Sequence, residues 1–306
     1  MKPTTQQDSR TVLTRFFERH PTLHAYIQLM RLDKPVGIWL LLWPTWWSLW
    51  LASQGHPSWK NLAIFTAGCI LMRSAGCVIN DYADRDLDGH VARTRLRPLA
   101  SGRLPAQHAL ILFAVLCLLA FGLVLLTNTL TVKLSFGALL LATLYPFCKR
   151  HTNLPQVVLG AAFACAVPMA WAAEAGKLKP EAGLLFCTTL IWTMAYDTFY
   201  AMVDRDDDIK IGVRSTAILF DDADKTITAI LQSLVILSLI LLGHKFQMGL
   251  PFYSGLLIAS GLFVWQQHLI REREPAACLR AFLNNQWVGL VIFIGIATDY
   301  WLQPVT

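Results

Sequence analysis

Nine long apolar runs restrict the fold of this chain more than any other feature. Their approximate ranges are 36–53, 61–79, 107–126, 130–147, 154–173, 182–203, 226–243, 249–266 and 286–303. A helix of roughly 20 apolar residues crosses the hydrocarbon core of a bilayer. Helices and closed barrels alone satisfy their backbone hydrogen bonds there. We therefore predict an all-α integral membrane protein, a bundle of about nine transmembrane helices.

The composition agrees with a membrane protein. The chain is 55% hydrophobic and 15% charged, whereas soluble domains carry about 25% charged residues. Short loops join the apolar runs, which favours one bundle over separate domains. We expect residues 1–35 to form a cytoplasmic N-terminal segment and residues 36–306 to form a single transmembrane domain.

The basic residues indicate the orientation of the bundle. If alternate loops share a side, twenty of the 26 Lys and Arg residues lie on the side of the N-terminus. Five lie on the other side, and Arg73 falls within the second run. Cytoplasmic loops are enriched in Lys and Arg, so we predict a cytoplasmic N-terminus. The net charge of +6 follows from this topology, and we expect no nucleic-acid partner. Trp39, Trp43 and Trp301 fit interfacial aromatic belts.

An acidic cluster follows the second run, with the sequence NDYADRDLD. Residues four apart share one face of a helix. Asn80, Asp84 and Asp88 are therefore predicted to form one oxygen-rich stripe at the end of that helix.

A second acidic cluster follows the sixth run, with the sequence DRDDD. Tyr200, Asp204 and Asp208 are predicted to share one stripe, with Asp197 one heptad earlier. The two clusters are separated by an even number of spans, so they end at the same membrane face. Like charges at this spacing repel without a cation. Mg²⁺ binds such hard oxygen ligands and often completes its coordination with substrate phosphates. Solvated acidic helix ends are common, but a matched pair at one face favours a metal–diphosphate site.

Basic and aromatic groups end at the same face. Tyr145 and Lys149 are four apart, and Arg150 follows. Such cations can stabilise a departing diphosphate, although positive charge here also fits ordinary topology. Arg31 precedes the first run and can reach a phosphate, a carboxylate or simply the interface. The basic segment 93–98 is predicted to be either a lid over the site or a solvated loop. The cysteines and histidines show no ligand spacing.

Two longer strings carry a family resemblance. NDYADRDLDGHVARTRLRPLASG resembles the first aspartate-rich motif of the UbiA prenyltransferase superfamily, and YDTFYAMVDRDDDIKIGVRSTAI resembles the second. RLDKPVGIWLLLWPTWWSL and LYPFCKRHTNLPQVVLGAAF are similar to stretches of its bacterial 4-hydroxybenzoate polyprenyltransferase branch. The resemblance extends from about residue 31 to residue 301.

The resemblance implies a fold and a set of site residues. The fold is a UbiA-type bundle around a central cavity that opens laterally toward lipid. Tyr145 and Lys149 match an element beside the diphosphate, and Arg150 matches a basic position near the substrates. Tyr200 and Asp197 are predicted to bind substrate. The residues implied to hold Mg²⁺ and diphosphate are Asn80, Asp84, Asp88, Asp204 and Asp208.

The resemblance also implies a reaction. A polyprenyl group would pass from a polyprenyl diphosphate to the ring carbon ortho to the hydroxyl of 4-hydroxybenzoate, as in ubiquinone biosynthesis. The site would lie at the cytoplasmic face of the cell inner membrane, with Mg²⁺ as cofactor. Arg85, Arg150 and Arg31 are candidate partners for the benzoate carboxylate. A naphthoate, haem or chlorin acceptor stays open. A cation transporter is a further alternative, but transporters bind near the bilayer midplane.

Overall fold

The computed structural model describes residues 19–91, 93–148 and 151–302, and these residues contain helices and no strands. The longer helices are α2 (Pro21–Leu29), α3 (Val36–Ala52), α4 (Trp59–Asp84), α5 (Ala106–Val124), α6 (Thr129–Cys148), α7 (Pro155–Ala164), α8 (Ala166–Ala175), α9 (Pro180–Ile211), α11 (Asp224–Lys245), α12 (Leu250–Leu269) and α13 (Pro275–Leu302). Short elements are η1 (Asp88–His90), α10 (Thr216–Phe220) and η2 (Asp221–Ala223). The all-α prediction is confirmed.

Each predicted span matches a helix or a helix pair within the described residues. Six helical segments in that part of the chain are long and apolar enough to cross a membrane, and α3 is a shorter apolar helix. The protein is therefore a multi-pass membrane protein. The fifth span is divided between α7 and α8. Pro168 explains the division, because a proline ring clashes with the carbonyl four residues earlier, and α7 ends at that residue, Ala164.

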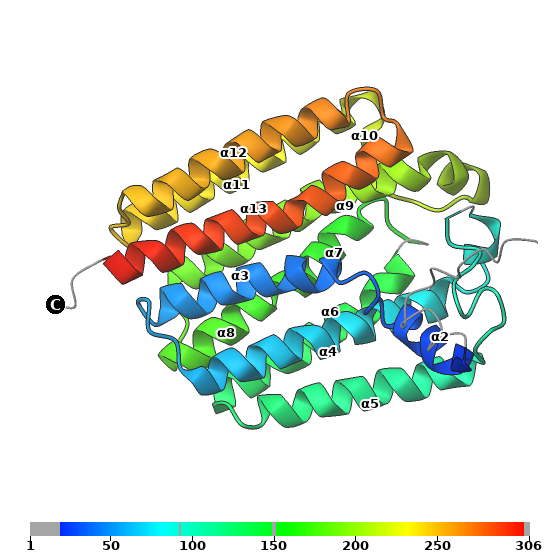
Figure 1. Cartoon of the computed structure of the whole chain (residues 1–306), viewed down its shortest axis with the longest axis horizontal. Helices are drawn as coiled ribbons and strands as arrows, with labels where there is room; N and C mark the ends of the chain where they lie inside the picture. Colours follow the sequence, from blue (N-terminus) through cyan, green and yellow to red (C-terminus); the bar gives the residue numbers. More distant parts are fainter. Residues whose placement is uncertain (1–18, 92, 149–150, 303–306) are drawn as a thin grey trace, which may run out of the picture.

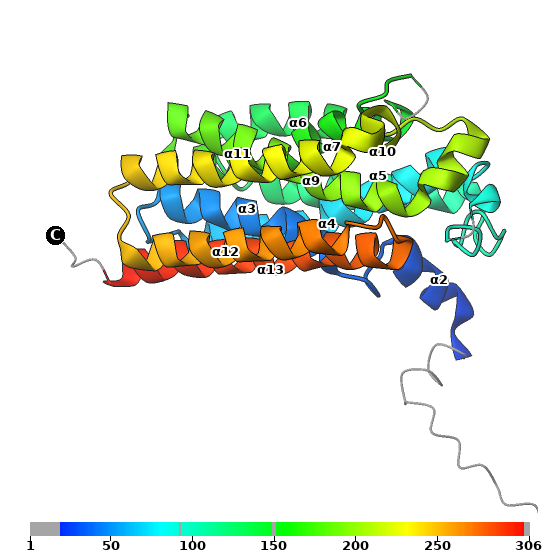
Figure 2. The same ribbon diagram turned by 90° about the horizontal axis from the view of Figure 1, so that it is seen from above.

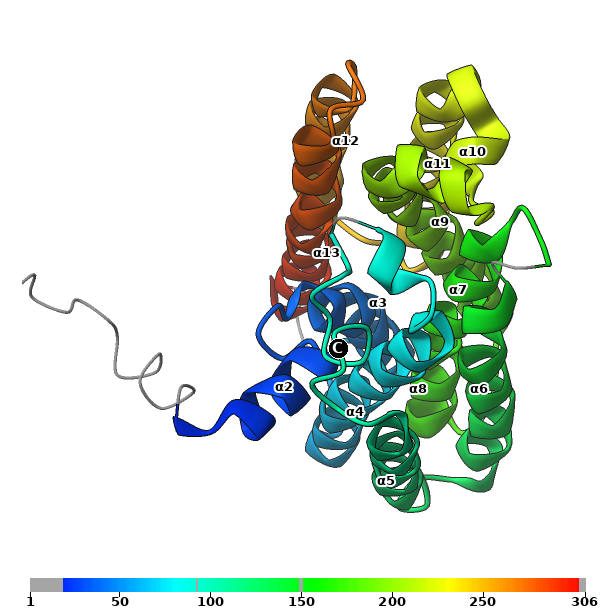
Figure 3. The same cartoon turned by 90° about the vertical axis from the view of Figure 1, so that its right-hand side faces the viewer.

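The long helices from α3 onward run nearly parallel to the long axis of the molecule, whereas α2 is inclined to it (Figures 1 and 2). α4 and α9 both finish at one end, which we call the acidic end. In the view along the bundle, the segment that carries η1 crosses this end (Figure 3). α11 packs on α9, and α12 packs on α13. This arrangement brings the ends of α4 and α9 to the same face of the bundle, as the sequence predicted.

Close packing around α3 fixes one wall of the bundle. Trp47 is fully buried, its ring stacks on Trp192 with centroids 5.3 Å apart, and its Nε1 donates to the Gly289 carbonyl at 3.1 Å. A Cβ atom on Gly289 would lie 2.3 Å from Trp43. Small residues let membrane helices approach closely. The prediction of an interfacial Trp43 is wrong, because this packing leaves it only 7% exposed.

Candidate active site

A cavity of about 1210 Å³ occupies the bundle and reaches its acidic end. Its lining comes from α2 to α9, α13, and the segments that precede α3, follow α4 and follow α9. Both predicted acidic clusters line it. Residues that are far apart in the sequence therefore share one cavity, with carboxylates at one end and apolar side chains beyond them.

The first cluster is not the continuous helical stripe that its spacing predicted. α4 ends at Asp84, and a turn follows in which the Leu87 N–H donates to the Asp84 carbonyl at 2.8 Å. Asp88 then begins η1. The side chains of Asp84 and Asp88 are both buried and both line the cavity. Asn80 Nδ2 donates to Asp84 Oδ2 at 3.2 Å. The predicted four-residue spacing along a helix therefore holds for Asn80 and Asp84, but not for Asp84 and Asp88.

The second cluster keeps its predicted stripe. α9 is continuous through Ile211, and Gly212 ends it in the left-handed conformation with φ of 73°. Asp204 and Asp208 line the cavity, together with Tyr200 and Asp197. Because α9 continues past the apolar run, it carries these side chains in register from the apolar interior to the acidic end.

Two arginines from the segment after α4 connect the clusters. Arg97 Nη1 lies 2.9 Å from Asp88 Oδ2 and 3.1 Å from Asp81 Oδ1. Arg93 Nε donates to Asp204 Oδ1 at 2.9 Å, and its guanidinium also contacts Tyr200. Burial raises the pKa of Asp88 above its ordinary value, and the Arg97 guanidinium opposes that rise. The sequence left segment 93–98 as either a lid over the site or a solvated loop. The contacts of Arg93 and Arg97 with the cavity carboxylates favour the lid.

The donor set fits a metal that is shared with a ligand. No group of three or more His, Cys, Asp or Glu side chains in the described residues is close enough to hold a metal alone. Mg²⁺ usually takes one or two carboxylates and fills its other positions with phosphate oxygens or water. The carboxylates of two clusters across one cavity suit a Mg²⁺–diphosphate ligand better than a bare ion.

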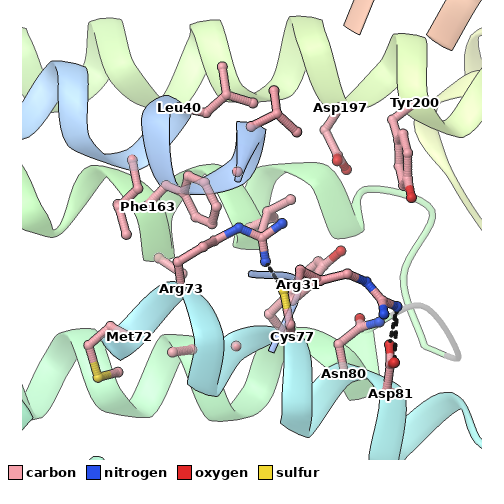
Figure 4. A pocket seen from close by; sticks show the side chains of 18 of the residues that line it. Arg31, Leu40, Met72, Arg73, Cys77, Asn80, Asp81, Phe163, Asp197 and Tyr200 are labelled. Atoms are coloured by element: carbon pink, nitrogen blue, oxygen red, sulfur yellow. Dashed lines mark hydrogen bonds and ion pairs between the residues drawn. The ribbon is translucent and has the colours of Figure 1, made fainter. Parts of the chain in front are cut away.

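Arg73 is a cavity residue that the motif analysis did not assign. It projects from α4 into the space between α4 and α9 (Figure 4). Its Nη1 donates to Cys77 Sγ at 2.6 Å, its guanidinium lies 5.6 Å from the centroid of the Phe163 ring, and its buried Nε has no hydrogen-bond partner. A Cβ atom on Gly37 would lie 2.3 Å from this Nε. A lone arginine within an apolar run was the available signal, since such residues are usually functional.

The other predicted residues occupy varied positions. Arg31 lines the cavity, and its Nη2 lies 3.0 Å from both carboxylate oxygens of Asp81 (Figure 4). Arg85 donates to the Tyr82 carbonyl at 2.8 Å and is not among the described cavity-lining residues. Tyr145 lines the cavity from α6. The predictions for Lys149 and Arg150 lie outside the described residues.

We expect Arg97→Ala to lower the stability of the protein. Asp88 is 6% exposed and pairs with Arg97, so removing Arg97 leaves its buried charge uncompensated, whereas Asp81 keeps its ion pair with Arg31. Breaking a buried ion pair costs about 3 kcal/mol or more. Thermal unfolding in detergent measures the effect, with Arg95→Ala as the control because Arg95 is exposed on the same segment. Equal midpoints for the two variants would contradict the assigned ion pairs.

Known proteins are similar to this chain over most of its length. The family model described as "UbiA prenyltransferase family" matches residues 41–292. The chain is 61% identical over 284 residues to the 4-hydroxybenzoate octaprenyltransferase of Ectopseudomonas mendocina (strain ymp), covering 93% of this chain and 96% of that protein. It is 58% identical to the enzyme of the same name from Pseudomonas aeruginosa (strain LESB58), with the same coverage.

Solved structures share the fold at low sequence identity. A UbiA homolog from Aeropyrum pernix K1 superposes with a TM-score of 0.77 at 22% identity, covering 86% of this chain and 97% of that chain. A UbiA homolog from Archaeoglobus fulgidus, bound to GPP and Mg²⁺, gives 0.68 at 15% identity, covering 90% and 99%. The family model covers most of this chain, and close relatives match it nearly end to end. The chain therefore belongs to the UbiA prenyltransferase family.

Proposed function

We propose that this protein transfers a polyprenyl group from a polyprenyl diphosphate to the ring carbon ortho to the hydroxyl of 4-hydroxybenzoate. The products are 3-polyprenyl-4-hydroxybenzoate and diphosphate, in ubiquinone biosynthesis. The observation that carries the proposal is the meeting of two acidic clusters at one end of a largely apolar cavity. The names of relatives 58–61% identical to this chain support the acceptor and suggest an octaprenyl donor.

The acidic end would hold the diphosphate. Carboxylates that face one cavity from two sides can bind Mg²⁺ on both sides of the ligand. The residues that would hold Mg²⁺ are Asn80, Asp84, Asp88, Asp204 and Asp208. When bound, Mg²⁺ neutralises the charge that develops on the leaving oxygen. Arg93 and Arg97 already lie against these carboxylates and would donate to phosphate oxygens. Tyr145 and Lys149 remain predicted contacts of the same group.

Arg73 would bind the carboxylate of the acceptor. Its Nε is a buried donor without a partner, and no carboxylate of the described residues pairs with it. Guanidinium groups match carboxylates in a two-point geometry. Arg31 already pairs with Asp81, and Arg85 contacts its own helix end. Of these arginines, Arg73 is therefore the one that best fits a new anion in the cavity.

The reaction then follows from these positions. The carbon–oxygen bond of the prenyl diphosphate breaks, and the released diphosphate stays at the acidic end. The ortho carbon of the ring forms the new carbon–carbon bond with the allylic carbon. A base in the cavity takes the ring proton, and Asp197 is the acid of the α9 stripe farthest from the end of that helix. The apolar lining beyond the acidic end would limit the access of water to the allylic centre.

We also propose that the protein lies in the inner membrane with its acidic end at the cytoplasmic face. Twenty of the 26 Lys and Arg residues support this orientation. A single cysteine introduced at exposed Asp206 in a cysteine-free background should react with an impermeant maleimide only when the cytoplasmic face is accessible. Labelling of intact cells from the periplasm would contradict the orientation.

Product analysis tests the proposed function. The purified protein receives octaprenyl diphosphate and labelled 4-hydroxybenzoate, with Mg²⁺ or with EDTA, and a naphthoate replaces the benzoate in a parallel reaction. We expect a prenylated benzoate in the reaction with Mg²⁺ and none in the reaction with EDTA. A product with the naphthoate and none with the benzoate would show that the proposed acceptor is wrong, while the prenyl-transfer reaction would stand. No product with either acceptor would overturn the function.

A further inference from the structure

Gln156 is a polar cavity residue that belongs to neither acidic cluster. It lies in the first turn of α7, and the other residues of that helix that line the cavity are Leu159, Ala162 and Phe163. A helical turn contains 3.6 residues, so these four side chains share one face. Gln156 is 5% exposed and is the polar one among them. A buried amide is costly unless its donors and acceptor are used.

A backbone contact fixes the orientation of the Gln156 amide. The Thr216 N–H donates to Gln156 Oε1 at 3.0 Å, and since a backbone N–H only donates, the atom that it meets must be the amide oxygen. The amide nitrogen, Nε2, has no hydrogen-bond partner among the residues that the structure describes. An NH₂ group donates and does not accept. A ligand that satisfies Nε2 must therefore present an acceptor atom.

The same contacts define the depth of Gln156 in the cavity. The segment after α9 folds back along that helix, because Thr216 Oγ1 lies 2.7 Å from Thr198 Oγ1. Gln156, which contacts Thr216, therefore lies near the level of Thr198. The six positions from Thr198 to Asp204 on α9 correspond to about 9 Å at 1.5 Å per residue. A diphosphate held by the second acidic cluster would thus lie nearer the end of α9 than Gln156 does.

Arg73 lies farther from the acidic end than Gln156. Its guanidinium is 5.6 Å from the centroid of the Phe163 ring (Figure 4), and Phe163 follows Gln156 by seven residues on the same face of α7. Seven residues of helix correspond to about 10 Å. A carboxylate and a hydroxyl in para positions of one benzene ring, each with a hydrogen bond of about 2.9 Å, bridge a distance of this order. A meta hydroxyl lies closer to the carboxylate and points away from this line.

We infer that Gln156 Nε2 donates to the 4-hydroxyl oxygen of the acceptor and so selects a para-hydroxy acid. This inference rests on the proposed function and specifies its acceptor site. With the carboxylate at Arg73 and the hydroxyl at Gln156, the hydroxyl and its ortho carbon form the end of the ring that faces the acidic end. The allylic carbon of the donor would meet the ring there. An acid without the 4-hydroxyl leaves Nε2 buried and unpaired, which weakens binding.

Acceptor binding without turnover tests this role. The full-length protein in nanodiscs, with Mg²⁺ and geranyl thiodiphosphate as an unreactive donor analogue, is titrated calorimetrically with 4-hydroxybenzoate, 3-hydroxybenzoate and benzoate. We expect the unmodified protein to bind 4-hydroxybenzoate about tenfold more tightly than benzoate, and 3-hydroxybenzoate to bind like benzoate. Equal affinities for 4-hydroxybenzoate and benzoate would overturn the inference, and this comparison needs no variant.

A pair of variants separates ligand binding from packing. Gln156→Leu should weaken the binding of 4-hydroxybenzoate about tenfold and change that of benzoate by less than about twofold. The matched control is Thr216→Val, which removes the hydroxyl contact with Thr198 that holds the same segment. Thr216 is not among the described residues that line the cavity. The control should therefore keep the preference for 4-hydroxybenzoate over benzoate.

A purely structural Gln156 would give a different pattern. Gln156→Leu would then weaken the binding of both acids by the same factor, and that result would overturn the inference. Weaker binding of geranyl thiodiphosphate, with an unchanged preference between the acids, would assign Nε2 to a phosphate oxygen and would also overturn it. Product formation by the unmodified protein tests the proposed function separately, because these titrations require no turnover.

Discussion

Replacing Asp84 or Asp204 by alanine should lower kcat/KM for prenyl transfer by about 10²–10³-fold, because one group that stabilises a developing charge is commonly worth that much in rate. Each carboxylate lines the cavity from a different helix, so each loss removes one side of the proposed diphosphate site. Asp84→Asn and Asp204→Asn keep the side-chain shape and should lose nearly as much. Steady-state product formation measures all four variants.

Neighbouring acids provide the matched controls. Asp86 follows two residues after Asp84, with its side chain 75% exposed, and Asp206 follows two residues after Asp204 on the exposed face of α9. Neither is among the described residues that line the cavity. Asp86→Ala and Asp206→Ala should keep activity within about twofold. Near-normal turnover in Asp84→Ala and Asp204→Ala, or equal loss in the controls, would refute the metal–diphosphate assignment.

Arg73→Met should raise KM for 4-hydroxybenzoate by about 30-fold to 4 × 10³-fold, because loss of one partner of a buried charge pair costs about 2–5 kcal/mol. KM for the prenyl diphosphate should change little, since Arg73 lies deeper in the bundle than the acidic clusters. The fold does not require this charge, and an unpaired cation in an apolar bundle is costly. Thermal stability in detergent should therefore stay the same or rise.

The methyl ester of 4-hydroxybenzoate makes the Arg73 prediction specific. The ester lacks the carboxylate, so the unmodified protein should discriminate strongly against it. Arg73→Met should use the acid and the ester about equally, and Arg73→Lys should recover part of the preference for the acid. If Arg73→Met still preferred the acid as strongly as the unmodified protein does, another cation would bind the carboxylate.

The bundle could be predicted from the sequence because each span is a long, nearly uninterrupted run of apolar residues. A run of about 20 apolar residues has few stable alternatives in a bilayer. Within the described residues, each predicted run coincides with a helix or helix pair, although α9 continues to Ile211 and α13 begins at Pro275, well outside their predicted bounds. The division at Ala164 follows from Pro168. The shared face of the two acidic clusters followed from counting spans. These features depend on local composition and chain order, which a sequence contains directly.

Other features depend on contacts that the sequence does not contain. Four-residue spacing predicted a helical position for Asp88, but α4 ends first, and a turn brings Asp88 to the same cavity. Trp43 lies in the middle of α3 and is buried, because Gly289 lies opposite it and lets the two helices approach closely. The pairing of Arg93 with Asp204 joins residues more than a hundred positions apart. Helix ends and long-range pairs of this kind are set by tertiary packing.

A crystal structure with Mn²⁺ in place of Mg²⁺, an unreactive thio-analogue of the prenyl diphosphate and 4-hydroxybenzoate tests the central claim most directly. The account predicts anomalous Mn²⁺ signal between the diphosphate and the carboxylates of Asp84 and Asp204, with the benzoate carboxylate at Arg73. Diphosphate bound outside the cavity, or Mn²⁺ away from both acidic clusters, would contradict it.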